Sequence, residues 1–179
     1  MSLALLAAQV GSAWCAEDFA VEVERQGRLF AVRARATVAA PLPVAWEVLT
    51  DYEKLPRFIP GITKSEVRLR SGNRLLVEQQ GEARFLLFSF PIEVRYEVLE
   101  SPPHRIASRA VGGNLRRMSG RYELHSDSPD AGMQLQYTGE MEPDFDLPPL
   151  AGAFALRRMA EAQFTAMVAE IERRAAARR

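Results

Sequence analysis

The sequence has little of the chemistry that catalytic and metal sites most often use. Its 179 residues include one cysteine, Cys15, and two histidines, His104 and His125. A single cysteine excludes a disulfide within the chain, and so few cysteines and histidines make no pattern typical of a zinc site. Both histidines are expected at the surface, because His104 lies at a turn after Pro103 and His125 precedes a polar loop.

Local catalytic motifs are absent as well. The sequence contains no nucleophile elbow, no zinc-protease helix, no phosphate-binding loop and no dinucleotide-binding glycine motif. Acidic residues gather at Glu140, Glu142, Asp144 and Asp146, just before a segment that we expect to be helical. Carboxylates in that place are explained by the dipole of the helix. We therefore predict no catalytic residue, no metal and no cofactor.

The chain has no excess of either charge. It contains 23 Lys and Arg residues and 23 Asp and Glu residues. Without a net positive charge, no long-range field attracts phosphate backbones or anionic headgroups, so nucleic acid is not an expected partner. Apolar residues make up 47% of the chain, which is enough for a substantial core in a single domain.

The N-terminal residues resemble an incomplete secretory signal. Residues 3–10 are apolar and small residues follow at 11–13, but no Lys or Arg precedes them. The run is too short to span a bilayer. We predict a partial signal segment or N-terminal extension at residues 1–16, a domain at 19–175, and a periplasmic or secreted protein. The alternative is a cytoplasmic protein with a short N-terminal helix.

Alternation of apolar and polar residues predicts a meander of antiparallel strands. The first long strand spans 30–38 and pairs with 19–24 through the turn at Gln26-Gly27. Later strands are expected at about 62–70, 73–83, 85–100, 104–111, 115–126 and 132–142. Short turn sequences separate them, as in antiparallel hairpins. Gly120 and Gly139 interrupt two inner faces, where a missing side chain permits a sharp bend or the close approach of another group, and we expect a strongly curved sheet.

Helical patterns occur at three places. A proline-rich stretch ends the first long strand and opens a short helix over 44–52, and a second short helix spans 54–58. Residues 149–175 have apolar positions at helical spacing and form the only long helix. The expected fold is α+β, with a curved antiparallel sheet around the long C-terminal helix and an apolar pocket between them.

Three polar residues fall on faces that the alternation predicts to be covered: Ser65, Gln79 and Arg116. A buried polar group needs a partner. Each of the three is therefore satisfied inside the protein, placed at the edge of the sheet, or directed at the polar end of a ligand.

The stretch from Val38 to Gly61 has the pattern V-x-A-P…W-x-V-L-T-D-Y…L-P-x-F-x-P. It closely resembles the opening helix pair of START-like (SRPBCC) proteins in the polyketide cyclase/dehydrase and coenzyme Q-binding group. Residues 113–124 and 150–174 also resemble that group, so the likeness covers roughly residues 30–175. It implies a helix-grip fold of about seven strands, whose cavity takes lipids, quinones, polyketides or other apolar molecules.

The leading prediction is a protein that binds or carries a hydrophobic small molecule, with transient membrane contact as a further expectation. The expected ligand-binding residues come from the inner face of the sheet and from the long helix: Phe88, Phe90, Ile92, Arg116, Met118, Tyr122, Met133, Tyr137, Leu150 and Phe154. Tyr122 and Arg116 are expected to orient a polar head.

Two alternatives follow from the same resemblance. One is a polyketide cyclase or aromatase, in which Tyr122, Tyr137 and Arg116 move protons. The other is a protein-docking module like the ribosome-association toxins of the superfamily. Zero net charge and the signal-like segment disfavour this second alternative, because an exported protein does not meet ribosomes.

Overall fold

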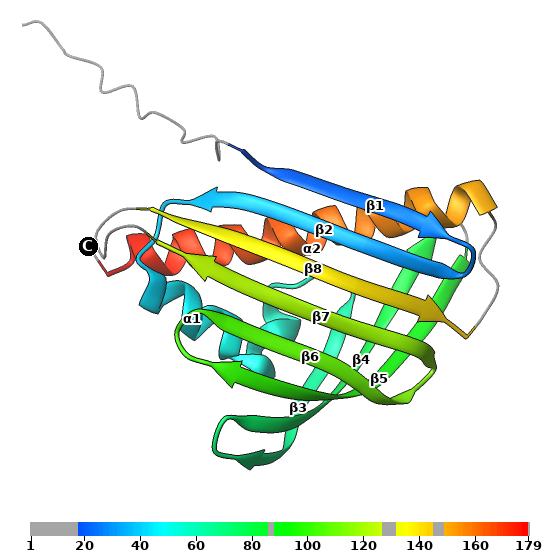
Figure 1. The fold of residues 1–179 in the computed structure, drawn as a ribbon, viewed down its shortest axis with the longest axis horizontal. Helices are drawn as coiled ribbons and strands as arrows, with labels where there is room; N and C mark the ends of the chain where they lie inside the picture. The colour runs from blue at the N-terminus through cyan, green and yellow to red at the C-terminus, as the bar shows by residue number, and fades with distance from the viewer. Residues whose placement is uncertain (1–17, 86–87, 127–131, 145–148, 179) are drawn as a thin grey trace, which may run out of the picture.

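A computed structural model describes residues 18–85, 88–126, 132–144 and 149–178. Within these ranges, eight antiparallel strands form one sheet in the order β1-β2-β8-β7-β6-β5-β4-β3, which curves around a long helix (Figure 1). The strands are β1 (Ala20–Gln26), β2 (Leu29–Val38), β3 (Ile62–Ser71), β4 (Arg74–Phe85), β5 (Phe88–Ser101), β6 (Arg105–Gly113), β7 (Leu115–His125) and β8 (Met133–Pro143). The helices are α1 (Leu42–Thr50), the 3-10 helix η1 (Tyr52–Arg57) and α2 (Pro149–Ala176).

The structure confirms the predicted α+β helix-grip class. Its eight strands match the eight segments that the alternation predicts, 19–24 included, and correct the number of about seven that the resemblance implies. Strand β1 pairs with β2 over its full length, from Ala20 opposite Arg35 to Gln26 opposite Leu29. Both strands have the period-two pattern of a sheet with one covered face, and the turn at Gly27 has the positive φ that glycine adopts easily. The predicted pairing through Gln26-Gly27 is therefore confirmed.

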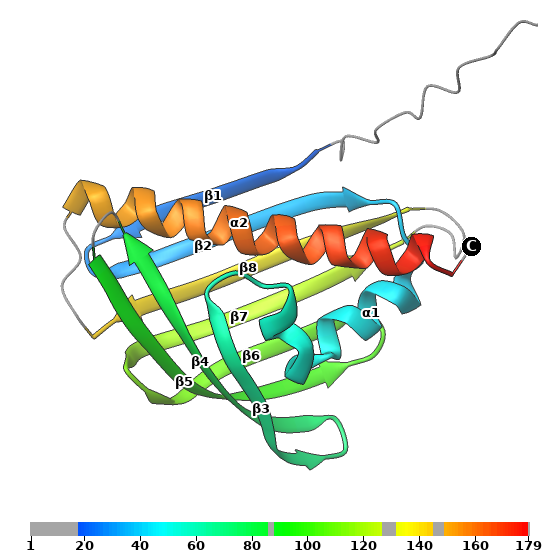
Figure 2. The same cartoon turned by 180° about the vertical axis from the view of Figure 1, so that it is seen from behind.

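Helix α2 lies across the concave face of the sheet (Figure 2). Its C-terminal half provides Phe164, Met167, Val168 and Ile171, all of which are buried. These side chains belong to the same core cluster as Leu124 and Leu135 on the inner face of β7 and β8. The N-terminal half of the helix covers a cavity, so the two halves of α2 have different roles.

Candidate functional site

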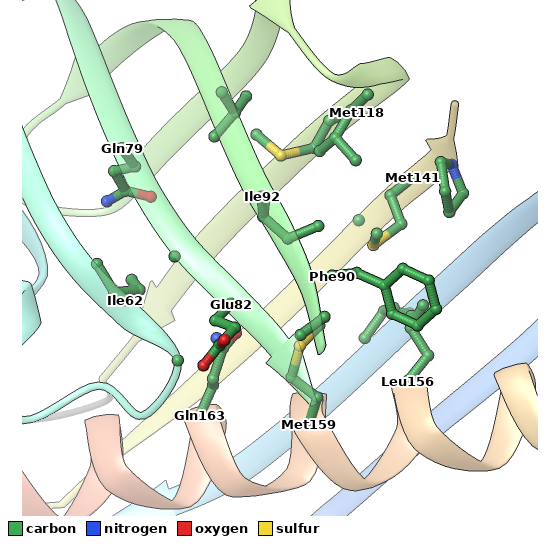
Figure 3. Close-up of a pocket in the computed structure, with 18 of the residues that line it drawn as sticks. Ile62, Gln79, Glu82, Phe90, Ile92, Met118, Met141, Leu156, Met159 and Gln163 are labelled. Atoms are coloured by element: carbon green, nitrogen blue, oxygen red, sulfur yellow. The ribbon is translucent and has the colours of Figure 1, made fainter. Parts of the chain in front are cut away.

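A cavity of about 220 Å³ lies between the inner face of the sheet and the N-terminal half of α2 (Figure 3). Most side chains that surround it are apolar. The sheet contributes Val32, Phe90, Ile92, Val94, Leu115, Met118 and Met141, and the helix contributes Ala155, Leu156 and Met159. Strand alternation on β5 and helical spacing on α2 direct these side chains inward.

The loop before β3 closes one side of the cavity. Gln163 Nε2 donates a hydrogen bond to the Pro60 carbonyl at 3.0 Å, and the Glu82 backbone N–H donates to the Gly61 carbonyl at 2.8 Å. A Cβ atom at Gly81 would lie 2.2 Å from the Gly61 carbonyl oxygen, so glycine is required at Gly81 for the loop to approach β4 this closely. The loop therefore bridges the sheet and the helix.

Tyr137 of β8 is part of the cavity lining. Its ring leans along the strand over two glycines, Gly139 on β8 and Gly120 opposite it on β7. A Cβ atom would lie 2.4 Å from the Tyr137 hydroxyl oxygen at Gly139 and 2.9 Å from it at Gly120. The two glycines noted in the sequence thus provide the space that the tyrosine occupies.

Two further tyrosines lie near Tyr137. The Tyr122 ring is 4.8 Å from the Tyr137 ring, centroid to centroid, at an angle of 46°. Burial raises the pKa of Tyr137 and Tyr122 above the ordinary value of 10, and burial followed by the nearness of Tyr122 and Tyr137 raises the pKa of Tyr96. All three phenols are therefore neutral at physiological pH.

Ser65 and Gln79, two of the three polar residues predicted on covered faces, are satisfied within the protein. Ser65 is 5% exposed, and its hydroxyl oxygen accepts a hydrogen bond from Gln79 Nε2 at 3.2 Å. Gln79 also lines the cavity. The internal hydrogen bond removes the need for a ligand to satisfy either residue.

Four of the predicted binding residues line the cavity: Phe90, Ile92, Met118 and Tyr137. Two others lie outside its lining. Met133 is 1% exposed and packs in the core, and Tyr122 packs against the same core beside Tyr137. Both side chains face inward, as the alternation predicts, but neither belongs to the cavity lining.

The prediction that Arg116 binds the ligand is wrong, because its side chain does not face the cavity. Its side chain is 52% exposed and forms an ion pair with Asp144. The register of β7 against β8 shifts between Leu115 and Arg117, as at a β-bulge. The extra residue breaks the alternation, so Leu115 and Met118 face inward while Arg116 faces outward. A polar head in the cavity would not meet this guanidinium.

The prediction that Phe154 lines the pocket is also wrong, because its side chain is 64% exposed. The buried positions at this end of α2 are Gly152 and Leu156, and 100° per residue places Phe154 on the opposite side of the helix from Gly152. The remaining predicted residues, Phe88 and Leu150, have side chains outside the described part of the structure.

Several lining residues were not named among the predicted site residues. Val32 and Leu156 are the clearest, since β2 alternation and the helical stripe place both on covered faces. Ile62 and Gln163 border the cavity because the loop before β3 folds back against α2, as the Gln163 bond to Pro60 shows. No local pattern in the sequence reveals that contact.

Charged groups are scarce in the lining. Among its described residues there is no Lys, Arg or His, and the carboxylates are those of Glu82 and Glu140. Glu140 forms an ion pair with Arg117 at 3.7 Å. Within the described ranges, no group of three or more metal-ligating side chains is placed to hold an ion, and no helix has the length and hydropathy needed to cross a membrane.

Comparison with solved structures supports the fold. An aromatase/cyclase from Streptomyces sp. R1128 aligns with a TM-score of 0.69 at 22% identity, covering 82% of this chain and 95% of that one. A STAR-related lipid transfer protein from Xanthomonas axonopodis aligns with a TM-score of 0.68 at 16% identity, covering 89% of this chain and 96% of that one. A START superfamily protein from Mycobacterium smegmatis aligns with a TM-score of 0.63 at 16% identity, covering 83% and 99%.

These identities are low enough that the alignments establish the fold and nothing finer. A search of curated protein sequences found no match. The decisive finding is at the level of the family: a model described as polyketide cyclase/dehydrase and lipid transport matches residues 38–168. The chain belongs to this polyketide cyclase/dehydrase and lipid transport family.

Proposed function

We propose that this protein binds and carries a hydrophobic small molecule, such as a lipid, a quinone or a polyketide-like compound, in the cavity under α2. The observation that supports this most strongly is the apolar lining of the cavity, from Phe90 and Ile92 on the sheet to Leu156 and Met159 on the helix. An apolar cavity with a few polar groups at its rim is the usual form of a small-molecule site.

The available driving force is modest but sufficient. Burial of apolar ligand surface contributes about 25 cal/mol per Å². A ligand that buries about 300 Å² therefore gains about 7.5 kcal/mol. After association costs of about 4 kcal/mol, the expected dissociation constant lies in the millimolar range. Such affinities suit a carrier that releases its cargo. The proposal includes transient contact with a membrane from which the cargo is taken.

A cyclase is the second candidate, supported by the family and by the similarity to the Streptomyces aromatase/cyclase. The groups around the cavity favour binding over catalysis. Arg116 lies outside the cavity, and the raised pKa of Tyr137 makes it a poor proton acceptor at neutral pH. Turnover of a candidate polyketide by the purified protein would establish the cyclase instead.

The proposal is tested by filling the cavity. Native mass spectrometry of protein purified from its host should show a co-purifying apolar molecule, and added quinones or fatty alcohols should raise the melting temperature. Ala155→Phe places a large side chain in the cavity lining and should abolish both effects. Arg157→Phe places the same side chain on the exposed side of the same helix and should preserve them.

Two results would contradict the proposal of ligand binding in this cavity. If wild-type protein carries no apolar molecule and no apolar compound raises its melting temperature, the binding function is wrong. If apolar compounds raise the melting temperature of Ala155→Phe as much as that of Arg157→Phe, binding occurs elsewhere on the protein.

We also propose export, on the basis of the signal-like segment at residues 1–16. Fractionation of cells that express the native gene should place the protein in the periplasm or the medium. Recovery from the cytoplasm alone would contradict this.

A further inference from the structure

We propose that the cavity selects an uncharged ligand with a compact apolar body and one hydrogen-bond-accepting oxygen, and that the hydroxyl of Tyr137 recognises this oxygen. The inference rests on the proposed binding function and specifies the class of ligand. Three features support it: the position of the hydroxyl, the charge of the lining and the size of the cavity.

The Tyr137 hydroxyl lies beside two glycines and has no hydrogen-bond partner among the described residues. Gly139 and Gly120 leave the space in which it lies. Every fully enclosed side-chain nitrogen or oxygen in the described structure has a hydrogen-bond partner, whereas no described residue forms a hydrogen bond with this hydroxyl. The hydroxyl is therefore open to accessible space, and Tyr137 lines the cavity. Burial raises its pKa, so it keeps its proton and can donate a hydrogen bond to a carbonyl, ether or hydroxyl oxygen.

The lining disfavours an anion. Its described residues include no cationic side chain, and the carboxylate of Glu82 lies beside Gln163 (Figure 3). A carboxylate or phosphate inside the cavity would lose its hydration without meeting a positive charge, which is costly. A fatty acid or phospholipid whose head enters the cavity is therefore a poorer ligand than a neutral molecule of the same size.

The volume limits the part of the ligand that is enclosed. An apolar protein cavity of roughly 150 Å³ accommodates benzene, and this cavity measures about 220 Å³. One or two fused rings, or a short branched chain, fill such a space. Sites for drug-sized ligands are larger, at about 300–1,000 Å³.

Three naphthalenes of nearly equal shape test the proposal. 2-Acetylnaphthalene carries a neutral carbonyl, 2-ethylnaphthalene carries no oxygen, and 2-naphthoate carries a negative charge at pH 7. Titration calorimetry or fluorescence should show the acetyl compound binding about five- to tenfold more tightly than the ethyl compound, the ratio expected for one neutral hydrogen bond. The naphthoate should bind at least about tenfold more weakly than the acetyl compound.

Variants at and near Tyr137 test whether its hydroxyl causes the preference for 2-acetylnaphthalene over 2-ethylnaphthalene. Tyr137→Phe should reduce the affinity for 2-acetylnaphthalene to that for 2-ethylnaphthalene, which should itself be unchanged. Gly139→Ala keeps the hydroxyl but would place a Cβ atom 2.4 Å from it, so it should also remove the preference. Tyr122→Phe removes the neighbouring hydroxyl, which does not line the cavity, and should preserve the full ratio.

The possible results distinguish this inference from the proposed function. The inference is wrong if 2-naphthoate binds as tightly as 2-acetylnaphthalene, or if Tyr137→Phe keeps the preference for the acetyl compound. It is also wrong if no naphthalene binds while a larger apolar molecule does, although the binding function then stands. If no apolar compound of any size binds, both proposals fail.

Discussion

At the scale of single residues, the most buried charge among the described side chains belongs to a hydrogen-bond network at the opposite end of β5 from the cavity. Glu100 is 6% exposed and accepts hydrogen bonds from the Tyr52 hydroxyl at 3.0 Å and from Arg70 at 3.3 Å. Tyr52 is the last residue of the T-D-Y motif and attaches η1 to the end of β5. Its role is to position the helix pair, since it does not line the cavity.

We expect Tyr52→Phe to destabilise the fold by about 1–3 kcal/mol, because a buried carboxylate oxygen would lose its donor. The midpoint of urea unfolding measures this loss. Tyr96→Phe is the matched control: Tyr96 is 7% exposed, and no described residue forms a hydrogen bond with its hydroxyl. Removal of that hydroxyl should be nearly neutral. Equal losses in the two variants would show that the bond to Glu100 contributes nothing.

At the scale of secondary structure elements, α2 divides into a half that builds the core and a half that covers the cavity. Its C-terminal half also carries an ion-pair network. Arg174 pairs with Asp51 at the end of α1 at 3.0 Å and with Glu170 of its own helix at 2.7 Å. Asp51 is the acidic residue of the T-D-Y motif, so two residues of this motif connect elements of the fold.

Helical phase decides which aromatic and aliphatic positions of α2 contribute to stability. Leu156→Ala should cost about 2–4 kcal/mol, because Leu156 is 7% exposed and its removal enlarges a cavity. Phe154→Ala should change stability by less than about 0.5 kcal/mol, because Phe154 is 64% exposed. Thermal or urea unfolding of the two variants measures the difference. A greater loss of stability for Phe154→Ala than for Leu156→Ala would contradict the placement of Phe154 on the exposed side of α2.

The network also predicts a dependence of stability on pH. Hydrogen bonds from Arg173, and then from Arg174, lower the pKa of Glu170 from 4.5 to about 2. A carboxylate with a depressed pKa stabilises the fold fully above its unfolded value and loses this contribution as the pH falls toward its folded value. Glu170→Gln should therefore cost on the order of 1 kcal/mol at pH 7, since Arg173 is largely exposed. The difference from wild type should shrink between pH 4.5 and pH 2.

Urea unfolding at pH 7, 4.5 and 3 measures the effect of Glu170→Gln. Glu161→Gln serves as a control on the same helix, because within the described residues Glu161 pairs only with the exposed Arg158, at 3.7 Å. Its loss should stay within about 0.5 kcal/mol at pH 7. A Glu170→Gln difference that does not shrink below pH 4.5 would show that the lost stability is not electrostatic.

At the scale of the whole molecule, the sheet grips α2 from β1 at one edge to β4 near the other. β1 brings Val21, which is 7% exposed, into the core, and the Phe19 ring lies 5.6 Å from the Phe164 ring of α2. Figures 1 and 2 show β1 running beside the helix along the edge of the sheet. Strand β1 therefore extends the contact between the sheet and α2.

A chain that begins at residue 29 should be less stable than one that begins at residue 18 by about 3 kcal/mol or more. It loses the burial of Val21 and Phe19, at about 1.5–3 kcal/mol each. It also leaves the edge of β2 unpaired, which promotes association between molecules. Melting temperature and size-exclusion chromatography measure the two effects. Equal melting temperatures and monomeric behaviour of both chains would show that β1 is dispensable.

The sequence alone determined the class of fold, the inward faces of most strands and the extent of the long helix. Period-two and helical patterns are local, and burial of an apolar face leaves few alternatives for residues such as Ile92, Met118 and Tyr137. The motif from Val38 to Gly61 carried the resemblance to the superfamily, and two of its residues, Asp51 and Tyr52, connect elements of the fold.

Only the tertiary structure decided which inward residues surround empty space. The bulge at Arg116 turned this one side chain outward, because an extra residue in one strand offsets the alternation before the bulge from the alternation after it. The helix position relative to the sheet turned Phe154 outward and brought Gln163 against Pro60. The space for the Tyr137 side chain exists because Gly139 of β8 pairs with Gly120 of β7. Local periodicity cannot specify these outcomes, because each depends on how distant segments pack against one another.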